Sequence, residues 1–336
     1  MTGEDGRPRT GRVGVVVNPT AGKGRGARAA EAVRAGLSRA GLTALDLSGP
    51  DADTAEARAR TGLVQGLDAL VVVGGDGMVH LGVNVVAGTG VPLGIVAVGS
   101  GNDVARDLAL PVHDVAASVA LIVAALGHGD RTAADGRAGG AADGVPGVRT
   151  LDAVAVSRPG GPVEHWYMAV LSCGIDAAVN DRANRMTWPA GAGRYVRALM
   201  VELAAFEPFG YRVTMDGQVW QGDGTLVAVA NTPCFGGGMR IAPDAVPDDG
   251  LLDVLIADGL TRTELMRLFP RVYKGTHLNH PAVRVHRARS VLIEPAARYG
   301  AAPPVAFADG ERLDALPLQC DLHPGAAQVL ARTLEE

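Results

Sequence analysis

Short apolar runs separated by polar, helix-like segments organise the first third of the chain. Continuous apolar runs lie at residues 13–17, 71–73 and 93–98, with a shorter strand predicted near 44–47. Runs of this kind are typical of parallel strands that helices cover on both faces. Helices are predicted between them, at about 26–40, 53–65 and 77–87. The order β-α-β-α-β-α-β predicts an α/β nucleotide-binding domain with a doubly wound parallel sheet over residues 11–127.

The pattern changes after residue 150 to short strands in which apolar and polar residues alternate. An Asp-Gly pair at 216–217 separates two of these strands and is a hairpin signal. Many short strands with turn residues between them predict a β-rich antiparallel sandwich or barrel-like domain, which we assign to residues 150–321. Residues 128–149 are rich in Gly, Ala and Asp without periodicity, so we predict a flexible insertion or linker there.

Composition supports two globular domains. The chain has 336 residues, of which 47% are hydrophobic, and single cores usually stop growing at about 250–300 residues. The net charge of −5 argues against a nucleic-acid partner. No apolar run reaches the length of a membrane-spanning helix, and the amino-terminal residues are polar. The three cysteines have neither metal nor redox spacing, so we expect a cytoplasmic protein.

Glycine-rich turns follow the apolar strands and predict a phosphate-binding crevice. They read NPTAGKG at 18–24, GGDG at 74–77 and GSGND at 99–103. Such turns meet at the carboxyl ends of parallel strands, where glycine lets backbone N–H groups approach a phosphate and a following helix adds its dipole. Lys23 and Arg25 suit the same ligand. We interpret Asp76 as a direct or water-mediated ligand of Mg²⁺; an Asp N-cap in a plain strand-to-helix turn is the alternative.

The motifs NPTAG at 18–22, GGDGMVH at 74–80 and VGSGNDVARDLALP at 98–111 resemble the bacterial diacylglycerol kinase family of soluble lipid kinases, relatives of sphingosine kinases. The resemblance implies an active site in the cleft between an ATP-binding domain and a β-rich domain. It also implies that the carboxy-terminal segment, 322–336, joins the first domain.

The same resemblance implies ATP contacts in all three turns. The predicted nucleotide-binding residues are Asn18, Pro19, Thr20, Ala21, Gly22, Lys23, Ser48, Gly74, Gly75, Asp76, Gly77, Met78, His80, Ser100, Gly101, Asn102 and Asp103. The family commonly has Thr and Asn where this chain has Met78 and His80, and Thr where it has Ser100. For His80 a buried structural role is the alternative.

A structural Mg²⁺ site is implied in the second domain. Residues 241–252, IAPDAVPDDGLL, place two carboxylates before Gly250, where a sharp turn can offer carbonyl oxygens to a hard cation. The resemblance implies that Asp249 holds this ion together with the backbone carbonyls of Val246 and Leu251. A plain Asp-Gly turn is the alternative.

The sequence FADGE at 307–311 carries the candidate catalytic carboxylates. The resemblance implies a general base here, which takes the proton of the lipid hydroxyl during in-line attack on the γ-phosphoryl group. Asp309 and Glu311 both fit this role and the sequence does not choose between them. A hairpin turn without catalytic function is the alternative.

Residues 181–200 place four arginines among Met, Trp and Tyr, which suits the headgroups of an anionic membrane; a solvated helix with an apolar core face is the alternative. We therefore expect a cytoplasmic lipid kinase of phospholipid metabolism that uses ATP and Mg²⁺, phosphorylates diacylglycerol or a related lipid, and contacts the membrane transiently. An NAD kinase-like enzyme, which shares GGDG, and a non-catalytic nucleotide- or lipid-binding regulator are the alternative functions. A homodimer is left open.

Overall fold

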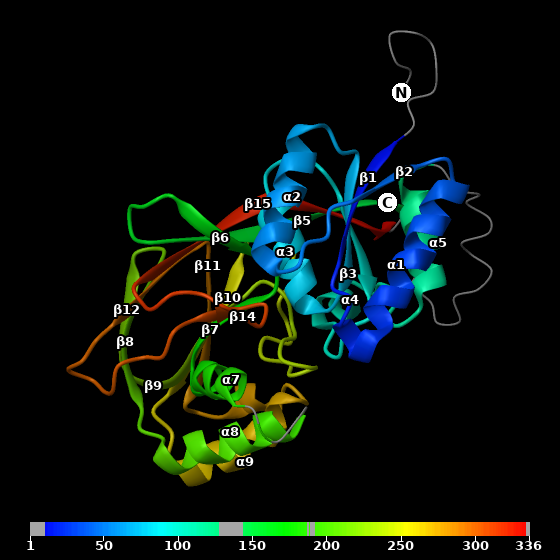
Figure 1. Cartoon of the computed structure of the whole chain (residues 1–336). Helices are drawn as coiled ribbons and strands as arrows, with labels where there is room; N and C mark the ends of the chain where they lie inside the picture. The colour runs from blue at the N-terminus through cyan, green and yellow to red at the C-terminus, as the bar shows by residue number, and fades with distance from the viewer. Residues whose placement is uncertain (1–10, 128–143, 187, 189–191, 334–336) are drawn as a thin grey trace. The chain divides into compact units, whose positions relative to one another are not determined.

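The computed structural model describes residues 11–127, 144–186, 188 and 192–333 (Figure 1). By its internal contacts the chain divides into two units, the first made of Met1–Leu151 with Gly325–Glu336 and the second of Asp152–Pro324. Residues 128–143 of the predicted linker lie outside the described residues. Residues 145–149 begin strand β5 (Val145–Ser157) instead of continuing a linker, because β5 pairs with β15 (Leu318–Thr333).

The first unit is built on a parallel sheet. Strand β1 (Arg12–Val17) lies between β2 (Thr43–Asp46) and β3 (Ala69–Gly74), and β3 pairs with β4 (Leu93–Ala97). The last part of β15 extends the sheet, with Val329 opposite Leu93 in a parallel pair. The predicted doubly wound sheet is therefore confirmed.

Helices cover both faces of this sheet (Figure 1). Helices α1 (Ala21–Arg39) and α5 (Val115–Ala125) lie on one face, and α2 (Ala52–Val64) and α3 (Asp76–Val86) lie on the other. Because both faces are covered, every residue of β3 is buried, and this explains its uninterrupted apolar run. The core on the α1 side joins alternate residues of β1 and β3 to Val33, Leu37 and Ile122.

The second unit consists mainly of antiparallel strands. Besides the parts of β5 and β15 that lie in it, its strands are β6 (Val163–Tyr167), β7 (Val170–Gly174), β8 (Phe209–Met215), β9 (Gln218–Ala230), β10 (Leu252–Asp258), β11 (Val283–Ala288), β12 (Ser290–Pro295), β13 (Phe307–Ala308) and β14 (Glu311–Arg312). Strands β7, β9, β10 and β11 pair in that order. The predicted hairpin is confirmed, with φ of 46° at Asp216 and 86° at Gly217. The predicted β-rich second domain is thus confirmed.

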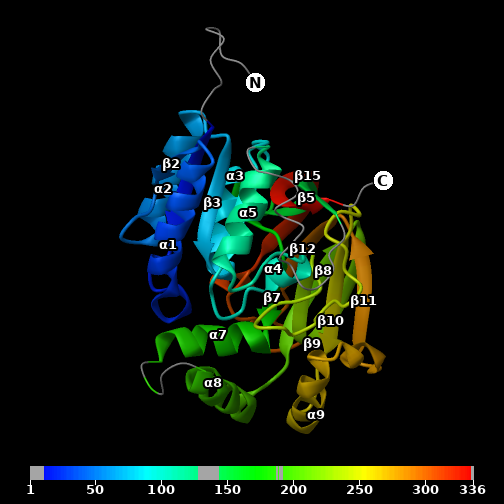
Figure 2. The same cartoon turned by 90° about the vertical axis from the view of Figure 1, so that its right-hand side faces the viewer.

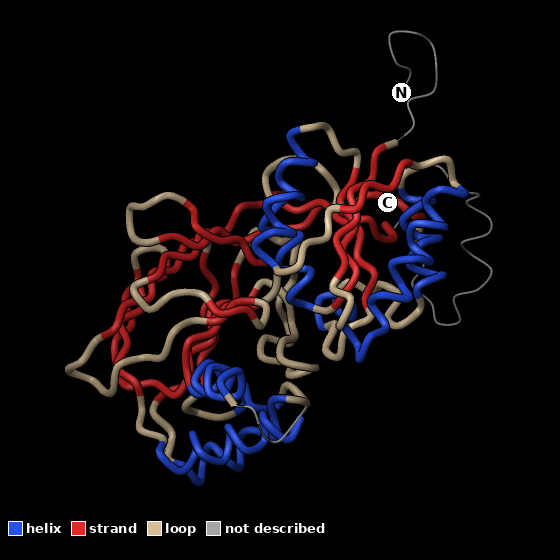
Figure 3. The backbone as a smooth tube through the Cα atoms, viewed as in Figure 1, coloured by secondary structure: helices blue, strands red, loops and turns tan. Residues whose placement is uncertain are grey.

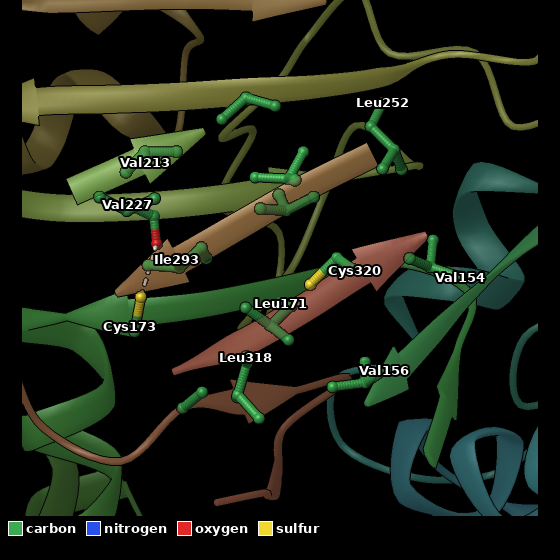
Figure 4. Close-up of a cluster of buried hydrophobic side chains, with 14 of the residues drawn as sticks. Val154, Val156, Leu171, Cys173, Val213, Val227, Leu252, Ile293, Leu318 and Cys320 are labelled. Carbon is green, nitrogen blue, oxygen red and sulfur yellow. Dashed lines mark hydrogen bonds between the residues drawn. The ribbon is translucent and has the colours of Figure 1, made fainter. Parts of the chain in front are cut away.

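Alternating apolar residues of these strands build the core of the second unit (Figure 4). Leu171, Val213 and Ile293 are among its fully buried members. Residues 163–174 form two strands, β6 and β7, instead of one continuous strand. The chain breaks between them because the amide of Met168 donates to the side chain of Asp309 instead of to a strand.

Helices α7 (Ile175–Arg185), α8 (Ala192–Ala205) and α9 (Arg262–Val272) gather at one end of the second unit, as Figures 2 and 3 show. A 3₁₀ turn, η1 (Thr276–Asn279), follows α9. Within the described ranges, no helix has both the length and the apolar character needed to cross a membrane.

Candidate active site

The three predicted phosphate-binding turns lie together in the first unit, at the carboxyl ends of β1, β3 and β4. The amide of Asn18 donates to the carbonyl of Val73 at 3.0 Å, which joins the first turn to the second. A Cβ atom on Gly99 would lie 2.4 Å from the Cα of Gly75, and one on Gly22 would lie 2.0 Å from the carbonyl oxygen of Val98. The turns are glycine-rich because their backbones pack directly against one another.

The carboxylate of Asp76 ties the second turn to the third. One oxygen accepts the amide of Asn102 at 2.7 Å and the other accepts the amide of Val104 at 3.3 Å. Asp76 is the first residue of α3 and Gly75 is its N-cap, so the Asp N-cap alternative is wrong. The side chain therefore holds the third turn in place before any ligand binds.

The third turn leads directly into the short helix α4 (Asp103–Asp107). Asn102 has a left-handed φ of 59°, and its side-chain amide donates to the carbonyl of Gly99 at 3.0 Å. Asp103 is 4% exposed and pairs with Arg106 at 3.5 Å. Ser100, by contrast, is exposed.

Two carboxylates border the space above Gly101. A Cβ atom there would lie 2.6 Å from Oδ2 of Asp76 and 3.9 Å from Oδ2 of Asp103. Mg²⁺ is usually bound by one or two carboxylates, water and substrate phosphates, so this pair fits such an ion. No group of three or more His, Cys, Asp or Glu side chains that could hold a metal occurs among the described residues. Magnesium binding would therefore depend on the phosphates of a bound nucleotide.

The first turn has an unusual backbone. Gly22, Lys23 and Gly24 have positive φ values of 57°, 62° and 88°, so regular helix begins only after them, near the predicted start at residue 26. Asn18 Oδ1 accepts from the amide of Thr20 at 3.0 Å and closes the turn locally. Ser48 lies beside this region, and its hydroxyl accepts the amide of Val17 at 3.1 Å.

Met78 and His80, the departures from the family pattern, both lie on α3. A Cβ atom on Gly74 would come within 2.3 Å of the Met78 side chain, so Met78 fills the space that Gly74 leaves open. His80 is 9% exposed, which agrees with the buried structural alternative. Met78 is therefore a packing residue of the second turn.

Basic side chains lie around the third turn, among them Arg25, which the sequence predicted for the phosphate site. Arg25 donates from Nε to the carbonyl of Gly22 at 2.9 Å and from Nη2 to that of Gly99 at 3.4 Å. Arg106 donates to the carbonyl of Gly101. Burial, then Arg25 and Arg106, lower the pKa of His113. Arg106 stands inside the family-like motif at 98–111, but no sequence signal pointed to His113.

In the second unit, the candidate catalytic carboxylates occupy a hairpin between β13 and β14. Asp309 and Gly310 form its turn, with φ of 51° and 86°. The carboxylate of Asp309 is buried and accepts three backbone amides: Met168 at 3.1 Å, Ala169 at 2.9 Å and Val170 at 3.3 Å. Glu311 is exposed. The segment does form a hairpin turn, as the alternative predicted. Within it, three backbone amides hold the side chain of Asp309, whereas Glu311 is exposed to solvent.

The predicted structural Mg²⁺ site contains an arginine. Asp249 pairs with Arg287 through one oxygen and accepts the amide of Leu251 at 3.0 Å through the other. The hydrogen bond that Arg287 donates to Asp249 raises the pKa of Arg287. Val246 is 43% exposed beside this turn. The guanidinium already supplies the positive charge, so Mg²⁺ binding by Asp249, Val246 and Leu251 stays a prediction.

An apolar cavity of about 260 Å³ lies in the second unit between the strands and helices α7, α8 and α9. Most of its lining is aliphatic or aromatic, including Leu203, Leu226, Leu255, Leu265 and Phe269. Its few polar lining residues are Asp176, Thr225 and His277. Sequence reasoning missed this cavity, although the apolar faces of α8 and α9 are visible in the printed sequence. A cavity of this composition suits a hydrocarbon chain.

Comparisons with known proteins agree with this geometry. Residues 12–132 match the diacylglycerol kinase catalytic domain, and residues 169–331 match the YegS C-terminal NAD kinase beta sandwich-like domain. A diacylglycerol kinase from Mycobacterium tuberculosis is 36% identical over 326 residues, which cover 96% of each chain. A diacylglycerol kinase from Bacillus subtilis is 24% identical over 84% of this chain and 85% of its own.

A solved structure of a diacylglycerol kinase from Bacillus anthracis str. Sterne has the same fold, with a TM-score of 0.66 at 20% identity over 97% of this chain and 98% of the other. The chain belongs to the diacylglycerol kinase family. It is accordingly a kinase with an alcohol group as acceptor, and the predicted family, fold class and enzyme class are confirmed.

Proposed function

We propose that the protein transfers the γ-phosphoryl group of ATP to the hydroxyl of diacylglycerol or a related lipid. The observation that carries the choice of a lipid acceptor is the apolar cavity of the second unit. Its aliphatic lining gains free energy by burying hydrocarbon but offers few hydrogen bonds to a polar acceptor such as NAD⁺. The names of the relatives, diacylglycerol kinase, support the same acceptor.

For the nucleotide, the glycine turns of the first unit would bind the phosphates through backbone N–H groups. Arg25 and Arg106, which already contact carbonyls of these turns, would add positive charge. Asp76 and Asp103 would hold Mg²⁺ against the phosphates, and the ion would neutralise the charge that develops during transfer. The role of the chain is then to orient the triphosphate.

Contact with the membrane is part of this proposal. Met200 and Met266 line the cavity and are 59% and 53% exposed, so apolar side chains of its lining also reach the surface. Trp188 is 70% exposed, with the guanidinium of Arg197 stacked 5.3 Å from its ring. An exposed Trp-Arg pair suits the interface of an anionic membrane, from which a lipid could enter the cavity.

Replacing Arg106 with alanine is expected to raise the KM for ATP about tenfold with a smaller change in kcat, because a charge-assisted contact to phosphate would be lost. The same result is expected for Arg25→Ala. Initial rates at varied ATP measure this effect. Arg28→Ala removes an exposed arginine one turn further along α1 and is the matched control. A KM unchanged in both variants would remove these arginines from the nucleotide site.

Transfer of labelled phosphate tests the function directly. The purified protein is incubated with γ-labelled ATP and Mg²⁺, and with either dioleoylglycerol in detergent micelles or NAD⁺. Label in the lipid fraction, lost on chelation with EDTA, is the expected result. Label in NAD⁺ alone would favour the NAD kinase-like alternative. ATP binding without transfer to any lipid of a panel would favour the non-catalytic regulator.

A further inference from the structure

Arg287 lies at the turn of the second unit for which the sequence predicts a structural Mg²⁺. It belongs to β11 and stands directly opposite Asp253 of β10 in the antiparallel register. Its guanidinium pairs with Oδ2 of Asp249 in the turn, and its Nε lies 3.8 Å from Oδ1 of Asp253. The side chains of Asp253 and Asp249 are 8% and 26% exposed, so water screens their charges only in part. One arginine thus supplies positive charge to two carboxylates.

The carboxylate of Asp249 is already engaged through both of its oxygens. Oδ2 accepts from Arg287, and Oδ1 accepts the amide of Leu251 at 3.0 Å. A cation bound to this carboxylate would stand next to the guanidinium, and like charges repel strongly at such a distance. Mg²⁺ also requires a nearly ideal octahedral set of ligands. The turn therefore fits the guanidinium better than it fits Mg²⁺, and the two are alternatives for the same position.

The turn that Arg287 contacts is also hydrogen-bonded to β5 at two points. The amide of Asp152 donates to the carbonyl of Pro247 at 2.7 Å, and Oδ2 of Asp152 accepts the amide of Gly250 at 2.8 Å. Asp152 is 3% exposed. The two bonds flank Asp249, so β5 fixes the turn from one side and Arg287 of β11 fixes it from the other.

Asn231 connects Asp152 to the segment that holds Asp309. Asn231 directly follows β9 and is fully buried. Its side-chain amide donates to the carbonyl oxygens of Asp152 at 3.2 Å and of Met168 at 2.8 Å. Its backbone amide donates to the carbonyl of Ala169 at 2.8 Å. The amides of Met168 and Ala169 in turn donate to Asp309. Hydrogen bonds therefore run without a break from the turn to the hairpin of β13 and β14.

We propose that Arg287 takes the place of a metal ion as the resident cation of this turn, and that it is a positioning residue for the hairpin that carries Asp309 and Glu311. Without the guanidinium, two neighbouring carboxylates repel each other and displace the turn. The displacement reaches residues 168–169 through Asn231, because a hydrogen-bonded network responds as a unit. The positioning role rests on the proposed lipid kinase function, whereas the replacement of the ion does not.

Thermal unfolding of the full-length, nucleotide-free protein tests the replacement of the ion. The wild-type Tm is expected to be the same in EDTA and in millimolar MgCl₂. Arg287→Met is expected to lower the Tm by about 3–5 °C, because two carboxylates lose their shared cation. Arg284→Met is the matched control, since Arg284 lies on the same strand, is equally exposed at 46% and pairs with Asp258. This control should lower the Tm by less than about 2 °C.

Hydrogen exchange measures the positioning role without a kinase assay. The amides of residues 168–170 donate to Asp309, and Arg287→Met is expected to speed their exchange about tenfold while Arg284→Met leaves it unchanged. At saturating ATP the kcat of Arg287→Met should fall about tenfold with the KM for ATP nearly unchanged, because the nucleotide turns belong to the first unit. Arg287→Lys keeps the positive charge and should lose less in both measurements.

Three results would count against the proposal. A wild-type Tm that rises in MgCl₂, with the rise abolished by Asp249→Asn, would overturn it in favour of a metal site. Equal Tm, exchange and kcat in Arg287→Met and Arg284→Met would overturn both roles of Arg287. A lower Tm without faster exchange or lower kcat would overturn the positioning role. If Arg287→Met does not fold, Arg287→Lys and the response of the wild-type Tm to MgCl₂ decide.

Failure of the proposed function gives a different result. If no lipid is phosphorylated, the lipid kinase function is refuted, while the Tm and exchange measurements still decide the roles of Arg287. If dioleoylglycerol is phosphorylated and Arg287→Met has the kcat of the control Arg284→Met, the kinase function stands and the positioning role is refuted.

Discussion

Replacing Asp76 with alanine is expected to lower kcat for lipid phosphorylation about a thousandfold. The carboxylate accepts the amides of Asn102 and Val104, so its loss frees the third turn from the second. The same change removes one of the two carboxylates proposed to hold Mg²⁺. Two donors left without an acceptor should also cost stability, by about 1–3 kcal/mol each where water cannot replace the carboxylate. Initial rates and thermal unfolding measure the two effects separately.

Two control variants separate the effect of losing a carboxylate at this position from the effect of losing its charge alone. Asp53→Ala removes an exposed carboxylate from the first turn of α2 and should leave kcat unchanged. Asp76→Asn keeps the size of the side chain, but its NH₂ group would face a backbone N–H, which cannot accept a hydrogen bond. The asparagine also carries no negative charge to bind Mg²⁺. We expect Asp76→Asn to retain more stability than Asp76→Ala and to need more Mg²⁺ for half-maximal rate. Full turnover by Asp76→Ala would remove Asp76 from the site.

Local signals were sufficient to predict the first unit. Its strands are buried on both faces, so each appears as an apolar run, and each ends at a glycine turn. The close approach of Gly75 and Gly99 explains why glycine is required in both turns at once. The predicted turns therefore come together as expected, although the hydrogen bonds of Asp76 across 26 residues have no local signal.

In the second unit, the features that sequence reasoning missed depend on contacts between distant residues. Asp309, 141 residues beyond Met168, accepts the backbone amides that separate β6 from β7. The cavity is formed by helices and strands from separate parts of the chain, so no single segment reveals it. The hairpin signals at residues 216–217 and 309–310 were readable because each turn is made by its own two residues.

The structure also distinguishes the two carboxylates between which the sequence did not choose. Three backbone amides hold Asp309, whereas Glu311 is exposed and has one more rotatable bond. A general base contributes most when its position is fixed before the substrate arrives, because no entropy is then lost in the transition state. If the hairpin supplies the base, we therefore expect the larger kinetic effect at the held Asp309 and the smaller one at the exposed Glu311.

Replacing Asp309 with asparagine is expected to lower kcat about a thousandfold, since a general base contributes about 10²–10⁴ in rate. One side-chain oxygen remains to accept backbone amides, so the protein should stay folded with a reduced Tm. Glu311→Gln, the matched loss of charge two residues later, should change kcat less than about fivefold. Both variants are assayed with dioleoylglycerol and with monooleoylglycerol, at saturating ATP.

The reverse pattern, with activity lost in Glu311→Gln and kept in Asp309→Asn, would transfer the role of base to the exposed carboxylate. The three amides would then make Asp309 a purely structural residue that shapes the start of β7. Asp309→Ala separates these cases further, because it leaves all three amides without their acceptor and should lower Tm more than Asp309→Asn does. If Asp309 is the base, Asp309→Asn and Asp309→Ala lose similar activity although their stabilities differ. A purely structural role would instead make the loss of activity follow the loss of stability.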